Sequence, residues 1–264
     1  MPTSADIDYV LEHANAVLDP PLTRDDVIGT WAGLRPLLQP QLIDERASAK
    51  VSREHTVTEA APGLTVIAGG KLTTYRVMAK DAVDFALGTA RAKLRPSVTH
   101  KTPLVGADGY HSMVRQADRI RERYGWDLDK IDHLLERYGS DLRSLMTLVD
   151  EQPHLGQPLA SAPHYTAAEV VFACTHEGAL HLEDVLVHRV RLNMEVRDRG
   201  ISAIDEVAGL MADALGWDEE RLQHEKDNYR ARAEAELAAE QHSDDASASA
   251  TRSEAADVVA GFDD

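Results

Sequence analysis

The amino-acid sequence predicts an α+β protein in which short strands and helices come first and an all-helical part follows. Over the first 95 residues, apolar runs with strand spacing alternate with segments of helical period. Beyond residue 110, nearly every segment has apolar residues at helical spacing, with capping residues before it and glycines after it. We therefore expect four parts: a mixed part over 1–95, a linker over 96–110, a helical domain over 111–240 and a disordered acidic tail over 241–264.

The mixed part is expected to begin with an amphipathic helix over residues 5–18, which Pro20-Pro21 ends. Apolar or alternating runs then predict three short strands, over 29–38, 51–58 and 64–68. Pro62-Gly63 is a turn signal between the second and third strands, and the helical period resumes over 77–87. This part therefore mixes strands and helices, with a helix directly after its last strand.

The helical domain is predicted from seven segments with helical spacing: 112–124, 128–138, 141–149, 166–177, 181–199, 203–215 and 218–241. Asp141, Thr166 and Asp218 are candidate caps. Gly125, Gly139, Gly200 and Gly216 are candidate stops. The last segment is charged nearly all round, so it predicts a solvated helix more than a docked one.

The composition excludes several functional classes. A net charge of −17 argues against nucleic acid as a partner and against broad docking on anionic lipid, since both need a basic surface. Only seven of the 28 basic residues are lysine, which favours a high-salt cytoplasm, although an ordinary acidic protein has the same signature. Without a signal pattern or an apolar run of about 18 residues, a cytoplasmic location is expected.

The single cysteine and the scattered histidines predict no metal site. Cys174 has no partner for a disulfide, and its apolar helical surroundings predict a buried, inert thiol. His176 and His181 lack the spacing of a metal motif. Motifs for a nucleophile elbow, a phosphate-binding loop and G-x-G-x-x-G are also absent.

The strongest chemical signal is the run Gly69-Gly70-Lys71-Leu72-Thr73-Thr74-Tyr75-Arg76, which joins the third strand to the next helix. A helix start presents free N–H groups and the positive end of the helix dipole, so it suits an anion or an electron-rich cofactor edge. The two glycines let a ligand approach the backbone, and Lys71 adds a fixed charge.

Two arginines in apolar surroundings extend this signal. Arg35 lies in the first predicted strand and Arg53 in the second. Two converging arginines and a lysine form a natural receptor for a phosphate group. Taken singly, each arginine is better explained by pairing with an internal acid such as Asp25, Asp26 or Glu54. His55 fits an acid–base role or, equally well, a half-buried structural one.

These motifs bear a family resemblance. TWAGLRPLL, SREHTV and GGKLTTYRVMAKDAVD, in this order, resemble the C-terminal half of the flavin-dependent glycerol-3-phosphate dehydrogenases. YTAAEVVFACTHEGALHLEDVLVHRVRL resembles the helical cap domain that ends the same family, and the collinear match runs from about Ile7 to Leu215. The resemblance implies a partial FAD and substrate domain followed by an α-helical cap.

The resemblance also implies a reaction and a set of site residues. The family oxidises sn-glycerol 3-phosphate to dihydroxyacetone phosphate, passes hydride to FAD and sends electrons on to quinone at the membrane. Arg35 and Arg53 would hold the substrate phosphate, and Lys71 would be the catalytic residue beside substrate and flavin. Gly69, Gly70, Leu72, Thr73 and Thr74 would face the pyrimidine side of the flavin ring. That role agrees with a helix dipole that stabilises the reduced flavin.

One part of the family pattern is expected to be absent: the N-terminal dinucleotide-binding unit with its G-x-G-x-x-G. We therefore expect FAD binding and activity to need an N-terminal chain or subunit, through which the protein would lie at the inner face of the membrane. An alternative is a non-catalytic interaction protein that keeps the cap for partner association or a homodimer. A weaker alternative is an unrelated phosphate-binding α/β domain.

Overall fold

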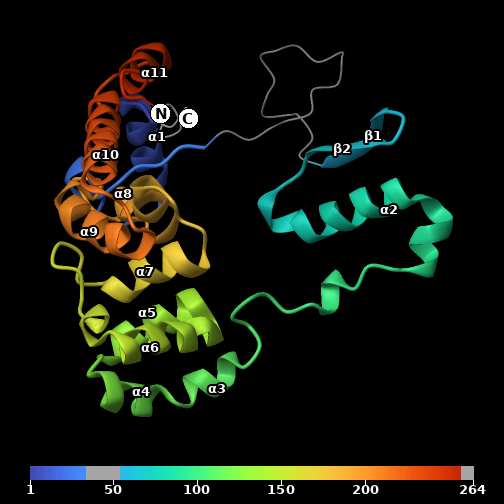
Figure 1. Ribbon diagram of the computed structural model, residues 1–264. Coiled ribbons are helices and arrows are strands. Elements are labelled where there is room, and N and C mark those ends of the chain that lie inside the picture. Colours follow the sequence, from blue (N-terminus) through green and yellow to red (C-terminus); the bar gives the residue numbers. More distant parts are fainter. Residues whose placement is uncertain (34–53, 257–264) are drawn as a thin grey trace. The chain divides into compact units, whose positions relative to one another are not determined.

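The computed structural model describes residues 1–33 and 54–256, which fold into two compact units (Figure 1). The helical unit comprises Met1–Ala32 and Val105–Asp264, and the hairpin unit comprises Gly33–Leu104. The predicted α+β class is confirmed, with short strands in one unit and helices throughout the other. The unit boundaries differ from the expected division at residue 95, because the N-terminal segment packs with the C-terminal helices.

The hairpin unit contains one antiparallel pair of strands and a helix. Strand β1 (His55–Ala61) pairs with β2 (Leu64–Gly69) around the predicted Pro62-Gly63 turn. Helix α2 (Tyr75–Leu94) then packs on this hairpin, and Gly88 kinks it with a φ of 76°. The predicted third strand and the helix after it are therefore confirmed, although the helix is longer than expected.

The first predicted strand is wrong where the structure describes it. Residues 29–33 form no strand, and the remainder of 29–38 lies outside the described residues. Directly before this segment, the carbonyls of Asp25 and Val27 accept hydrogen bonds from Arg197 of the same unit. Gly29 also lies against Met194: a Cβ at Gly29 would be 2.2 Å from the Met194 carbonyl oxygen.

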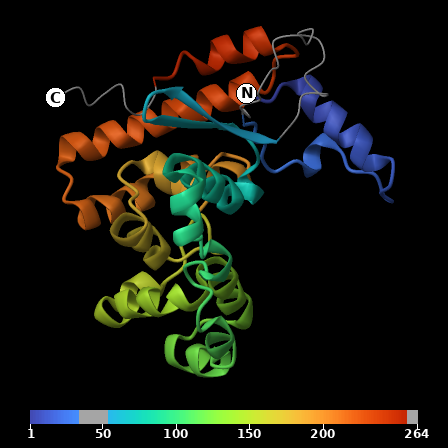
Figure 2. The same ribbon diagram turned by 90° about the vertical axis from the view of Figure 1, so that its right-hand side faces the viewer.

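The helical unit contains ten α-helices among its described residues (Figures 1 and 2): α1 (Ser4–Asn15), α3 (Tyr110–Val114), α4 (Ala117–Tyr124), α5 (Leu128–Tyr138), α6 (Leu142–Glu151), α7 (Ala167–His176), α8 (Leu192–Glu195), α9 (Ile204–Leu215), α10 (Glu219–Ala239) and α11 (Asp245–Arg252). Most follow the predicted periodicity. Thr166 and Asp218 cap α7 and α10, and Gly125 and Gly216 end α4 and α9 in the left-handed conformation.

The predicted helix over 181–199 is broken. A π-helical turn spans Asp184–Arg189, where the Val190 N–H donates to the Val185 carbonyl at 2.8 Å. Arg191 then adopts a left-handed backbone with a φ of 57°, and Arg199 does so with a φ of 54°. Left-handed residues cannot continue a right-handed helix, so the segment splits.

The prediction of a solvated last helix is also wrong. Helix α10 buries a face made of Glu225, Tyr229, Ala233, Glu236 and Ala239. Two positions of this buried face are glutamates whose carboxylates form ion pairs. The sequence of α10 therefore lacks the apolar periodicity that normally indicates a docked helix. Figures 1 and 2 show α11 beside α10, and this helix lies inside the predicted disordered tail. The tail prediction is therefore wrong for Asp245–Arg252.

The main apolar core lies in the helical unit. Its buried side chains come from helices α3 to α9, from the π-helical turn and from the segments that connect them, with Tyr229 and Ala233 added by α10. Cys174 is buried in this core, as predicted, and burial raises the pKa of its thiol to about 11. Every helix in the described part of the chain is too short or too polar to cross a lipid bilayer.

The buried cysteine leads to a first prediction. Cys174 in the folded protein should react with a thiol reagent such as DTNB at pH 8 at least about 100-fold more slowly than in the unfolded chain, because only the thiolate attacks. Absorbance measurements of the DTNB reaction with and without guanidinium chloride would give the ratio of the two rates. Equal rates in the two states would contradict the prediction.

Candidate functional site

The candidate site is the turn that links β2 to α2. Strand β2 ends at Gly69, and a 3₁₀ turn over Leu72–Thr74 precedes α2 (Figure 1). Gly69 and Gly70 have φ values of 79° and 83°, a left-handed backbone that favours glycine. The predicted order of strand, glycine turn and helix start is therefore confirmed.

The two halves of this turn differ in exposure. Gly70 is buried, and a Cβ at this position would lie 2.5 Å from Met78 Sδ of α2. Lys71, Thr73 and Thr74 are exposed, and Leu72 is 88% exposed. The turn is therefore anchored at the glycines while the following residues present their backbone outward.

The helix start has the geometry for an electron-rich ligand. Thr74 closes the turn, since its N–H donates to the Lys71 carbonyl at 3.0 Å and its hydroxyl donates to the same oxygen at 3.0 Å. The N–H groups of Leu72 and Thr73 begin the 3₁₀ turn, so no earlier carbonyl of that helix can accept from them. The Lys71 ammonium adds positive charge beside these donors.

The other predicted cations are placed differently. Arg35 and Arg53 lie outside the described residues. Arg76 does not join Lys71 in a free cationic pair, because its guanidinium donates to the Thr99 and Thr102 carbonyls and so ties α2 to the following loop. Of the expected cations, the described residues therefore place Lys71 alone at the turn.

His55 takes the structural role that the sequence left open. Its Nε2 lies 2.9 Å from Asp81 Oδ2 on α2, and its side chain is 20% exposed. Asp81 and Met78 of α2 meet the hairpin here, and neither residue was predicted from the sequence. Their i, i+3 spacing was the available signal, since it puts both on one face of the helix.

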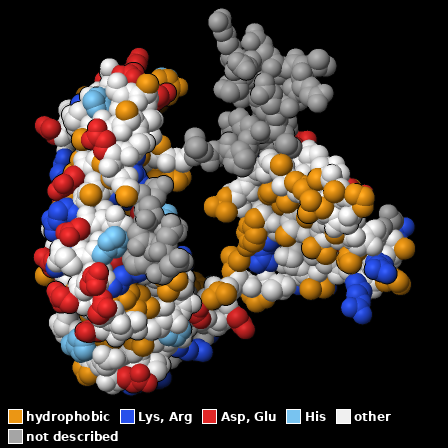
Figure 3. Space-filling view, turned by 45° about the horizontal axis from the view of Figure 1, so that its top comes forward, with side chains coloured by type: hydrophobic (Ala, Val, Ile, Leu, Met, Phe, Trp, Pro, Cys, Tyr) orange, Lys and Arg blue, Asp and Glu red, His pale blue; other side chains and the backbone are white. Residues whose placement is uncertain are grey.

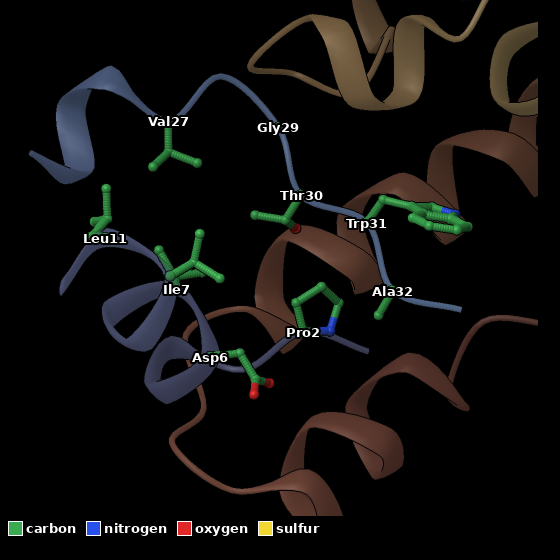
Figure 4. A pocket seen from close by; sticks show the side chains of 10 residues that line it. Pro2, Asp6, Ile7, Leu11, Val27, Gly29, Thr30, Trp31 and Ala32 are labelled. Atoms are coloured by element: carbon green, nitrogen blue, oxygen red, sulfur yellow. The ribbon is translucent and has the colours of Figure 1, made fainter. Parts of the chain in front are cut away.

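A separate apolar pocket lies in the helical unit, between α1 and the segment 27–32 (Figure 4). Its volume is about 400 Å³, and its side chains are mostly apolar: Pro2, Ile7, Val10, Leu11, Val27, Trp31 and Ala32. The polar Asp6 is already used, because its carboxylate accepts from the Thr3 N–H at 2.8 Å. The Thr30 hydroxyl also lines the pocket and bonds Glu240 and Arg199, so both polar side chains of the lining already have partners.

Comparison with known proteins agrees with this arrangement. Residues 97–222 match the C-terminal domain of alpha-glycerophosphate oxidase. Glycerol-3-phosphate dehydrogenase 2 of Mycobacterium bovis is 45% identical over 258 residues, which cover 98% of this chain and 44% of that protein. The glycerol-3-phosphate dehydrogenase of Mycobacterium leprae is 44% identical over 253 residues.

A solved structure extends the comparison to the fold. The glycerol-3-phosphate dehydrogenase from Bacillus halodurans, complexed with FAD, superposes with a TM-score of 0.67 and 26% identity. The match covers 88% of this chain and 45% of that one. The chain thus spans less than half the length of the relatives it matches.

The fold and these matches place the chain with the C-terminal region of a family of dehydrogenases, one solved member of which is complexed with FAD. The chain belongs to the FAD-dependent glycerol-3-phosphate dehydrogenase family and corresponds to its C-terminal part. The individual roles of Arg35, Arg53, Lys71 and the turn residues stay predictions.

Proposed function

We propose that this chain works as the C-terminal part of a dehydrogenase that oxidises sn-glycerol 3-phosphate to dihydroxyacetone phosphate and passes the electrons on to quinone. The observation that carries the proposal is the Gly69–Lys71 turn, anchored by its glycines and open at its helix start, in a chain related to an FAD-complexed dehydrogenase. FAD, when bound, accepts the hydride from C2 of the substrate.

The turn residues fit the edge of a flavin ring. Gly69 carries no Cβ, so a planar ring can lie close to the backbone at this residue, whereas Gly70 is packed on Met78 and anchors the turn. The N–H groups of Leu72 and Thr73 would donate to the electron-rich pyrimidine edge, and the helix dipole would favour its negative charge. Lys71 would act beside substrate and flavin, with Arg35 and Arg53 holding the substrate phosphate through charge-assisted hydrogen bonds.

The hairpin unit supports the need for a partner. Figure 3 shows apolar side chains gathered on its surface. Eleven large apolar side chains are exposed there: Leu64, Val66, Leu72, Tyr75, Val77, Val83, Phe85, Leu87, Leu94, Val98 and Leu104. A patch of this extent marks an interaction surface. We infer that an N-terminal FAD-binding portion, on the same chain or a separate subunit, covers it, and that the assembly works at the inner face of the membrane.

A chimera tests the proposal. This chain would replace the matching C-terminal part of the Mycobacterium bovis relative, and flavin absorbance and dye-coupled oxidation of sn-glycerol 3-phosphate would be measured. We expect a flavin-loaded, active chimera and no flavin on the isolated chain. Arg35→Ala should raise KM about 10- to 100-fold, the range for a lost charge-assisted hydrogen bond.

The matched control is Arg123→Ala, which removes an exposed arginine paired with Asp150 on the helical unit. It should leave KM within about twofold. A chimera that oxidises the substrate equally well with and without Arg35 would contradict the assigned phosphate-binding role.

A further inference from the structure

The hairpin unit holds its strands to its helix through a polar contact. Nε2 of His55, the first residue of β1, lies 2.9 Å from Asp81 Oδ2 in the second turn of α2. His55 also pairs with Gly69 in the strand register. One residue therefore touches both the end of β2 and the helix that follows the glycine turn.

The glycine turn is seated at the same place. Among residues 54–104, excluding the side chain of Thr89, Gly70 is the one buried residue that the structure describes. A Cβ at Gly70 would lie 2.5 Å from Met78 Sδ and 3.3 Å from the His55 Cβ. His55, Gly70 and Met78 thus meet where β2 ends and the turn begins.

The contact between His55 and Asp81 has a larger part in fixing the hairpin on α2 than it would have in a domain with a packed apolar core. Within the same described residues, no large apolar side chain is fully buried, so little apolar packing fixes the angle between hairpin and helix. Asp81 also faces Lys80, whose Nζ lies 3.3 Å from Asp81 Oδ1 and 2.9 Å from Asp84 Oδ2. Glu54 is a further charged residue here, since it directly precedes His55 in the chain.

We propose that His55 is a positioning residue for the Gly69–Thr74 turn: by holding β1 to Asp81 of α2, it sets the direction in which the turn presents its N–H groups and Lys71. The inference rests on the proposed function, because it assigns the turn a ligand.

Hydrogen exchange of the whole chain, followed by mass spectrometry, tests the positioning directly. His55→Leu should speed exchange in the peptide over 69–76 on the order of tenfold, while peptides of α5 and α6 stay unchanged. His55→Gln, which places an amide donor near the former Nε2, should restore most of the protection. Lys80→Met is the matched control, since it removes the other cation at Asp81 without touching β1, and it should leave the turn unchanged.

The conservative variant separates positioning from simple loss of fold, because glutamine restores a hydrogen-bond donor without the imidazole ring. The hydrogen bond from His55, opposed by burial and aided by Lys80, lowers the pKa of Asp81, so its carboxylate is charged at neutral pH and can accept from either side chain. Equal turn exchange in wild type and His55→Leu, or no recovery of protection in His55→Gln, would overturn the proposal.

A second readout uses the chimera. There His55→Leu should reduce flavin occupancy or kcat by about tenfold and change KM for sn-glycerol 3-phosphate less than twofold, because it disturbs the turn and not the phosphate arginines. An inactive wild-type chimera would count against the proposed function, while the exchange measurement would still decide the role of His55.

Discussion

Replacing Arg199 with leucine is expected to lower the free energy of unfolding of the helical unit by about 3–5 kcal/mol, the usual loss when one partner of a buried ion pair is removed. The Arg199 side chain is 2% exposed, and its Nη1 lies 2.9 Å from Glu236 Oε2. Its Nη2 donates to the Glu240 carboxylate and, at 3.0 Å, to the Thr30 hydroxyl. Leucine would leave two carboxylates without this cation.

The charge on Glu236 makes this loss large. Burial by itself would raise the pKa of Glu236, but the hydrogen bond from Asn193 and the charges of Arg232 and Arg199 hold it below the ordinary value. The carboxylate therefore stays ionised in the interior at neutral pH, where an unpaired charge is costly. Without Arg199, Glu236 must either remain charged with fewer partners or take up a proton.

Urea unfolding followed by circular dichroism at 222 nm would measure the loss. Arg123→Leu, at an exposed pair with Asp150, is the control and should change stability by less than about 1 kcal/mol. Arg199→Lys should fall between the two, because it keeps the charge but not the fork of donors. An equal loss of stability in Arg199→Leu and Arg123→Leu would contradict the prediction. It would mean that the buried contacts of Arg199 contribute no more than an exposed ion pair.

Replacing Glu169 with leucine should have the second largest effect, a loss of about 3 kcal/mol in the free energy of unfolding. Leucine would leave several buried hydrogen-bond donors without their acceptor. Glu169 is fully buried, and its Oε2 accepts from the Thr166 N–H at 2.7 Å. Its Oε1 accepts from the Tyr138 hydroxyl at 3.2 Å and lies 2.8 Å from His133 Nε2. One carboxylate thus caps α7 and joins it to α5.

Thermal and urea unfolding would test this prediction with Glu169→Gln and Glu136→Leu alongside. The amide keeps one acceptor oxygen, so Glu169→Gln should lose less than Glu169→Leu. Glu136 is exposed on α5, and its replacement should change stability by less than about 0.5 kcal/mol. A loss of stability in Glu169→Leu no larger than that in Glu136→Leu would contradict the prediction. It would mean that the buried donors of Thr166, Tyr138 and His133 find other acceptors at no cost in free energy.

Local signals in the sequence predicted much of the fold. The order of the helices, the caps at Thr166 and Asp218, and the hairpin turn at Pro62-Gly63 all rest on interactions between residues close in sequence. The glycine turn was predicted for the same reason, since its backbone conformation depends on Gly69 and Gly70 themselves.

The errors arose where partners far apart in sequence decide the structure. Helix α10 looked solvated because its buried acids, Glu225 and Glu236, do not show as an apolar stripe, yet Arg199 and other distant partners satisfy them. The break in the segment 181–199 follows from left-handed residues at Arg191 and Arg199, which only surrounding packing can hold. Residues 245–252 are helical and pack on α10 despite their polar composition.

By itself, the sequence determined the family, the α+β class and the glycine turn that carries Lys71, because motifs and turn conformations depend on residues that are neighbours in the chain. Only the tertiary structure decided that Arg76 donates to the Thr99 carbonyl and that His55 lies against Asp81. It also decided that the charged helix α10 packs on the rest of its unit. These outcomes depend on which donors and acceptors meet across space, and hydrogen bonds between distant residues leave no periodic trace in the chain.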